Sequence, residues 1–115
     1  MIISPWANMR SMMSKPRYRW LLNRLRHQPA GLEECSPDLI VEYSKATGAK
    51  VFYRINEYPR CPQLTRDFGK LVKYKLAVRK RSFLYDLNGF MVTPQATYIY
   101  RLTPVAANSL TWVDR

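Results

Sequence analysis

Two cysteines and one histidine are the side chains of this sequence best suited to covalent or metal chemistry, but their spacing supports neither. Cys35 and Cys61 form no Cys-x-x-Cys pair, and with the single His27 they cannot complete a zinc site. A nucleophile also needs a nearby base and an orienting group, and no signature surrounds either cysteine. We therefore expect no catalytic residue, metal, cofactor or small-molecule substrate, and no enzymatic activity. The cysteines are predicted to be thiols in a reducing compartment, with a disulfide between them as the alternative.

The composition points instead to electrostatic binding. The 115 residues include 19 Lys and Arg against 8 Asp and Glu, which gives a formal net charge of +11. Such a surplus repels itself unless a polyanion neutralises it, and the usual polyanions are nucleic acid and an anionic membrane surface. A hydrophobic fraction of 47% and an aromatic fraction of 13% indicate a folded domain rather than a disordered tail. We expect no membrane-spanning segment, because no run of about eighteen apolar residues is present.

The basic residues concentrate in two groups, within residues 17–26 and 73–81. Arginine contacts phosphate through two N–H groups and stacks on bases, which suits the irregular backbone of RNA. The predicted RNA-binding residues are Arg17, Arg19, Arg24, Arg26, Lys73, Lys75, Arg79, Lys80 and Arg81. A solvated face without a partner is the alternative for each group. The interleaved aromatic residues Tyr18, Trp20 and Tyr74 are predicted to lie in the core rather than to stack on bases.

The N-terminal region is basic and poor in acid. The first acidic residue is Glu33, and an Arg-rich, acid-free start resembles a mitochondrial targeting segment. We interpret residues 1–16 as a basic N-terminal arm that becomes ordered against a partner. Terminal apolar residues such as Trp6 and Trp112 are expected to be buried at protein contacts.

The first half of the chain contains one predicted helix and one segment that is either a helix or a strand. Ser36 is a suitable N-cap, Pro37 fits the first helical position and Gly48 suits a left-handed exit, so residues 36–48 should form a helix. Residues 18–27 are ambiguous. Apolar residues at i, i+3, i+4 and i+7 favour a helix there, while alternation with arginine is also compatible with a strand.

Extended structure is predicted after the helix at 36–48. Residues 51–55 are β-branched and aromatic, which favours a strand. After a turn at residues 59–62, the segments 63–68 and 71–78 flank Gly69-Lys70 and are predicted to form an antiparallel hairpin. A short helix is expected over residues 82–89 and a strand over residues 97–102.

This order of elements resembles a thioredoxin-like domain, in the version shared by mitochondrial ribosomal proteins and a small accessory subunit of respiratory complex I. The resemblance covers about half of the chain. It is carried by residues 40–45, 51–55, the pair Cys61-Pro62, and residues 63–69, 74–78 and 81–82. It implies a small mixed sheet with one main helix and no redox dithiol, and Pro62 would correspond to the cis-proline of such folds.

The sequence thus predicts an α/β protein with a basic arm at residues 1–16, a thioredoxin-like domain at 17–89 and an extended tail at 90–115. The resemblance implies a structural constituent of the mitochondrial ribosome, in the matrix, bound to ribosomal RNA and neighbouring ribosomal proteins. The alternative is a non-catalytic accessory subunit of a respiratory-chain complex, which would act as a protein scaffold. The charge of +11 favours the RNA-binding role.

Overall fold

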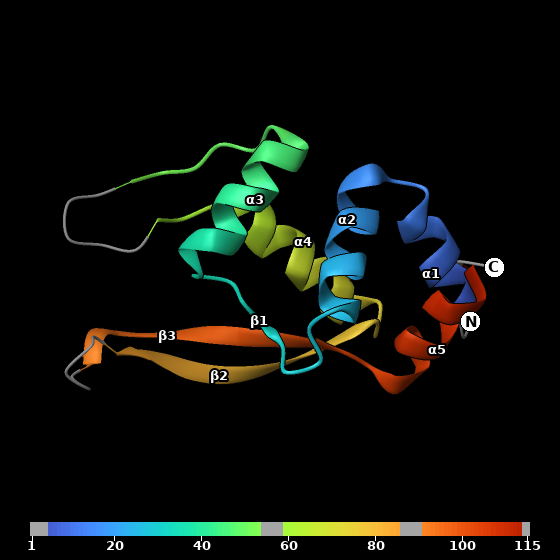
Figure 1. Ribbon diagram of the computed structural model, residues 1–115. Helices are drawn as coiled ribbons and strands as arrows, with labels where there is room; N and C mark the ends of the chain where they lie inside the picture. Colours follow the sequence, from blue (N-terminus) through green and yellow to red (C-terminus); the bar gives the residue numbers. More distant parts are fainter. Residues whose placement is uncertain (1–4, 54–58, 86–90, 114–115) are drawn as a thin grey trace.

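The computed structural model describes residues 5–53, 59–85 and 91–113. Within them the chain forms a mixed α/β fold with five helices and a three-stranded antiparallel sheet (Figure 1). In chain order the elements are α1 (Pro5–Met13), α2 (Pro16–Arg26), β1 (Leu32–Glu33), α3 (Pro37–Thr47), α4 (Pro62–Lys73), β2 (Ala77–Tyr85), β3 (Met91–Leu102) and α5 (Pro104–Val113). No described helix is long and apolar enough to cross a membrane.

The helix predicted at residues 36–48 is confirmed, and the ambiguous segment 18–27 is helical up to Arg26. The Ser36 side chain accepts a hydrogen bond from the Leu39 N–H at the start of α3, and Gly48 ends that helix in the left-handed conformation. Residues 16–26 form α2 rather than a strand. Its buried residues lie at the helical spacing read from the sequence; they are Tyr18, Leu21, Leu22 and Leu25.

The predicted hairpin at residues 63–68 and 71–78 is wrong. Residues 62–73 form α4, in which Leu64, Phe68 and Leu71 are spaced i, i+4, i+7 and are fully buried. Pro62 occupies the first turn of this helix, where its missing N–H costs nothing, and its peptide bond is trans. Gly69 lies inside this helix rather than in a turn. The helix tolerates it, because one glycine lowers helix stability by only about 1 kcal/mol.

Two other predicted elements are also corrected. Over residues 51–55 the described part contains only an isolated bridge from Phe52 to Arg60, and residues 54–55 lie outside the described chain. The helix expected at 82–89 is wrong over its described residues, because β2 continues to Tyr85; residues 86–89 lie outside the described chain. β2 continues because it pairs with the longer β3 as far as Met91.

The strand predicted at residues 97–102 is confirmed as part of β3, the central strand of the sheet. β1 and β2 pair with β3 from either side, and every described pairing is antiparallel, so the sheet is not mixed as predicted. Helices α2, α3 and α4 lie on one side of this sheet (Figure 1). Tyr100 of β3 stacks on Phe68 of α4 with ring centroids 4.1 Å apart, which joins the sheet to the helical layer.

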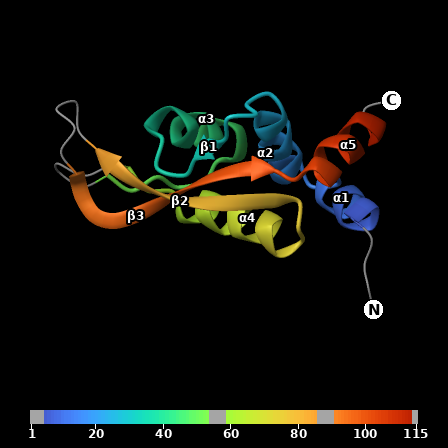
Figure 2. The same ribbon diagram turned by 90° about the horizontal axis from the view of Figure 1, so that it is seen from below.

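Both ends of the described chain contribute to the packing. Met9 and Met12 of α1 are buried in the core, and the Asn8 side chain donates a hydrogen bond to the Tyr74 carbonyl at the end of α4. The tail beyond residue 103 forms α5, which lies beside α1 at one end of the molecule (Figures 1 and 2). The predicted arm and tail therefore both pack against the body. The side chains of Trp6 and Trp112 lie outside the described set.

Candidate nucleic-acid interface

The outer face of α4 carries a row of cations. Arg66, Lys70 and Lys73 are spaced i, i+4, i+7, so they share one side of the helix, opposite the buried stripe, and all three are exposed. We call these three residues the α4 row. Asp67, the carboxylate next to Arg66 in the sequence, is only 2% exposed and points toward the core, so it does not face a ligand approaching the row.

The α4 row continues toward the start of α2 through the ring of Tyr18. Lys70 Nζ lies 6.0 Å from the centre of this ring, Lys15 Nζ lies 5.9 Å from it, and the Arg17 guanidinium carbon lies 4.8 Å from it. Tyr18 itself is 1% exposed, as expected for a core residue. The ring face attracts all three cations and holds them together despite their mutual repulsion.

The row also continues past the end of α4 into the sheet. Lys75 adopts a left-handed backbone, with φ of 61°, in the tight turn between Tyr74 and β2. Arg79, Lys80 and Arg81 then follow on β2, the edge strand, and all are exposed. Every residue of the second predicted group is therefore exposed, and α4, the turn and β2 carry these residues one after another along the chain.

The strand register sends the β2 cations to both faces of the sheet. Arg79 pairs with Tyr100, which faces the helices, and its guanidinium lies 4.5 Å from the ring centre of Tyr98. Lys80 pairs with Ile99 on the opposite face, away from α2, α3 and α4. Arg101 shares that face and donates a hydrogen bond to the Ala30 carbonyl at 3.1 Å.

The first predicted group does not form one cluster. Arg17 and Arg24 lie on one flank of the buried stripe of α2, and Arg19 and Arg26 lie on the other, because two residues of separation turn a helix by about 200°. Arg24 Nη2 lies 2.9 Å from Glu42 Oε2 on α3. The Arg19 side chain donates to the Met13 carbonyl at 3.2 Å.

Arg17, whose side chain is 42% exposed, reaches a polar network around the buried carboxylate of Asp67. Its Nε lies 3.4 Å from Asp67 Oδ1, and the hydroxyl of Tyr43 donates to Oδ2 of the same carboxylate. Burial, and then this hydrogen bond, raise the pKa of Tyr43. A hydrogen bond that Arg17 donates to the Tyr18 hydroxyl raises the pKa of Arg17 above its ordinary value. The network joins α2, α3 and α4 on the side of α4 that lies next to Lys70.

The residues considered for catalysis are separate from one another. Cys61 is buried and Cys35 is half-buried, and both are free thiols. Burial raises the pKa of the Cys35 thiol, which disfavours the reactive thiolate. The described residues contain no group of three or more histidine, cysteine or acidic side chains that could hold a metal ion.

The sequence interpretation missed Lys15, Arg66, Lys70 and Arg101. The spacing of 66, 70 and 73 was a usable signal, because it matches the apolar spacing of 64, 68 and 71 on the opposite face. It was overlooked because Gly69-Lys70 was interpreted as a hairpin turn. No local signal places Arg101, whose contact with Ala30 is distant in sequence, and Lys15 joins the row only because the nearby Tyr18 ring also contacts Lys70.

The fold and this surface define a mixed α/β protein with a cationic row along one helix and a basic edge strand. No model of a known protein family matches the chain, and comparison with curated proteins and with solved structures likewise gives no match.

Proposed function

We propose that the protein is a non-catalytic RNA-binding protein, whose α4 row, Lys75 and basic stretch of β2 contact the sugar-phosphate backbone. The observation that carries this proposal is the spacing of exposed cations on α4, with the neighbouring carboxylate Asp67 buried. Each phosphate neutralised by such a cation releases condensed counterions, and this release drives binding.

The buried side of α4 favours a polynucleotide over a membrane surface. A helix that binds lipid inserts an apolar face into the headgroup region while its cations contact the headgroups. The apolar face of α4 is fully occupied by the core, since Leu64, Phe68 and Leu71 are all 0% exposed. The row can therefore offer charge to a partner but no apolar anchor beneath it.

The narrower proposal is a structural constituent of the mitochondrial ribosome, which binds ribosomal RNA and neighbouring ribosomal proteins in the matrix. The Arg-rich, acid-free first 32 residues support it. The thioredoxin-like resemblance stays a prediction, and the RNA-binding proposal does not depend on it. The second candidate, an accessory subunit of a respiratory-chain complex, is favoured by the exposed apolar side chains Phe52, Tyr53 and Val78, which suit protein contacts.

The direct test is the salt dependence of binding to a structured RNA. If the α4 row and Lys75 make four phosphate contacts, the logarithm of the association constant should fall against the logarithm of the salt concentration with a slope of about −3. Vesicles of anionic lipid serve as the comparison polyanion. Binding to vesicles but not to RNA would contradict the proposal.

Sedimentation of a mitochondrial lysate in magnesium tests the narrower assignment. We expect the protein to migrate with a ribosomal particle and to leave it after ribonuclease treatment. Migration with a detergent-solubilised respiratory complex, unchanged by ribonuclease, would instead support the second candidate.

A further inference from the structure

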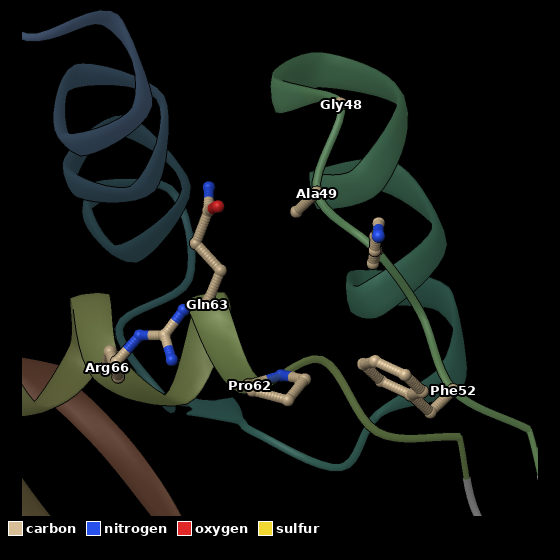
Figure 3. A pocket seen from close by; sticks show the side chains of 7 residues that line it. Gly48, Ala49, Phe52, Pro62, Gln63 and Arg66 are labelled. Atoms are coloured by element: carbon tan, nitrogen blue, oxygen red, sulfur yellow. The ribbon is translucent and has the colours of Figure 1, made fainter.

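A cleft lies where the end of α3 meets the start of α4, and the RNA-binding proposal makes no use of its interior. Its volume is about 450 Å³, within the range of small-ligand sites. Figure 3 shows the side chains around it, from the exit of α3 on one side and the first turns of α4 on the other. The lining residues are Gly48, Ala49, Lys50, Phe52, Pro62, Gln63 and Arg66.

The charged groups among the described residues of the cleft are Lys50 and Arg66, which come from opposite walls; no acidic residue of the described ranges lines it. Figure 3 shows the Arg66 guanidinium beside Gln63, extending from α4 toward the opening between the walls. Two cations on facing walls with no carboxylate between them suit a bound anion, and arginine matches the geometry of phosphate.

Phe52 gives the cleft an aromatic wall. This side chain is 55% exposed, and its backbone is fixed by two hydrogen bonds with Arg60, of 2.8 and 2.9 Å. An aromatic ring left half in water, on a backbone held by a bridge, is a platform on which a nucleic-acid base can stack.

Gln63 adds a fixed polar group. Its Nε2 donates to the Tyr43 hydroxyl at 3.0 Å, and Tyr43 is held in turn by Asp67. This bond orients the amide and uses one N–H, so the carbonyl oxygen and the second N–H can meet the edge of a base. The cleft therefore combines an aromatic face, an oriented amide and two cations.

We propose that this cleft binds one unpaired nucleotide of an RNA strand, with the base against Phe52 and Gln63 and the phosphate between Lys50 and Arg66. The inference rests on the proposed RNA-binding function and extends it. Arg66 is also the first member of the α4 row, so a strand leaving the cleft meets Lys70 and Lys73 next, about 6 and 10 Å further along the helix.

The aromatic wall distinguishes this ligand from an acidic peptide. A peptide carboxylate would be satisfied by Lys50 and Arg66 alone and would not require the exposed ring of Phe52. A nucleotide would contact both the cations and the ring of Phe52, because it carries an anionic phosphate and a flat apolar base in one molecule. An acidic peptide and a free mononucleotide are therefore the two competitors in the test.

The test uses the full chain and two fluorescent RNA probes. One is a single-stranded heptamer containing 2-aminopurine, whose emission falls when the base stacks, and the other is a blunt duplex. Phe52→Ala should weaken heptamer binding about tenfold and abolish the emission change, and should leave duplex binding unchanged. Tyr53→Ala is the matched control, because that ring is 71% exposed and does not line the cleft. It should change neither affinity.

The possible results separate the two proposals. If Phe52→Ala leaves heptamer affinity and emission unchanged while duplex binding persists, the cleft inference is overturned and the RNA-binding function stands. If neither probe binds the wild-type chain, both proposals fail. If adenosine 5′-monophosphate binds as tightly as the heptamer, the ligand of the cleft is a free nucleotide and not a nucleotide within a strand, which overturns the inference. A poly-glutamate peptide that displaces the heptamer from wild type and the Phe52→Ala variant equally would overturn the inference in favour of an acidic ligand.

Discussion

Helices α2 and α4 both carry several cations on short stretches of sequence, but the two sets face different surroundings. On α2, Arg17 and Arg24 lie close to the carboxylates of Asp67 and Glu42, and the other two arginines lie on the opposite flank. On α4, Arg66, Lys70 and Lys73 share one exposed side with no exposed acid among them. The density of basic residues is thus a poorer guide to a binding surface than the position of the acids.

The positions of the acidic residues explain why the cations of α2 and those of α4 have different surroundings. Four of the described acidic residues fall within residues 33–42, on β1 and the first half of α3. A second cleft, of about 410 Å³, is lined by Arg24 together with Glu33, Asp38 and Glu42. The sequence from Lys70 to Arg81 contains no acid at all. A polyanion approaching the α2–α3 side therefore meets carboxylates, whereas the described residues of α4 and β2 present no exposed carboxylate.

The largest expected effect comes from reversing charges on α4. Lys70→Glu combined with Lys73→Glu should weaken binding to a structured RNA on the order of 100-fold at low salt, because two contacts become repulsions. Arg19→Glu combined with Arg26→Glu makes the same change in net charge on α2 and should cost less than about fivefold. The measurement is fluorescence anisotropy, with circular dichroism to check folding. Equal losses in both double variants would show that the two helices bind alike.

The buried carboxylate that pairs with α2 should matter for stability. Asp67 is 2% exposed, and Asp67→Ala removes the acceptor of the Tyr43 hydroxyl and the ion-pair partner of Arg17, so the free energy of unfolding should fall by about 2 kcal/mol. Glu42→Ala is the control, because its pair with Arg24 is exposed, and it should cost less than about 0.5 kcal/mol. Urea denaturation measures both variants. A loss at Glu42 as large as that at Asp67 would refute the distinction between the two pairs.

Local signals in the sequence were sufficient for part of this comparison. The cap residues of α3 and the apolar spacing of α2 are encoded within one element each, so α3 was predicted and a helix was favoured over a strand for α2. α4 was missed because Gly69-Lys70 has the composition of a turn, and burial of Phe68 against Tyr100 outweighs that local preference. The long β2 was missed because residues 82–89 were interpreted as a helix, although β3, the next element of the chain, pairs with β2.

The candidate binding surface was also predictable only in part. Lys73, Lys75 and the three cations of β2 are close in sequence and could be grouped without a structure. Lys15 and Lys70 meet only through the buried ring of Tyr18, and the partners of Arg17 and Arg24 lie on other helices. Which cations remain available to a partner is therefore a property of packing.

A single neutral substitution should reveal an individual phosphate contact. Lys73→Gln should reduce the magnitude of the salt slope for RNA binding by about 0.7 to 0.9 and weaken affinity several-fold at low salt. Arg24→Gln should leave the slope unchanged, because this side chain already pairs with Glu42. The measurement is binding at five salt concentrations for each variant. A changed slope for Arg24→Gln would place this arginine in the interface.

The smallest effect is expected on the acidic side. Burial raises the pKa of Glu33, so the folded chain binds this proton more tightly than the unfolded chain does, and stability is lost as the pH rises through the raised pKa. Glu33→Gln should therefore raise the free energy of unfolding at pH 7 by a few tenths of a kcal/mol, since Glu33 is only partly buried and solvent screens its charge. The gain should vanish below about pH 4, where Glu33 is protonated in both states. Denaturation at pH 7 and pH 3.5 checks this.

RNA affinity should change less than about twofold, because Glu33 lies away from α4; a larger increase would mean that the polyanion also reaches the α2–α3 side.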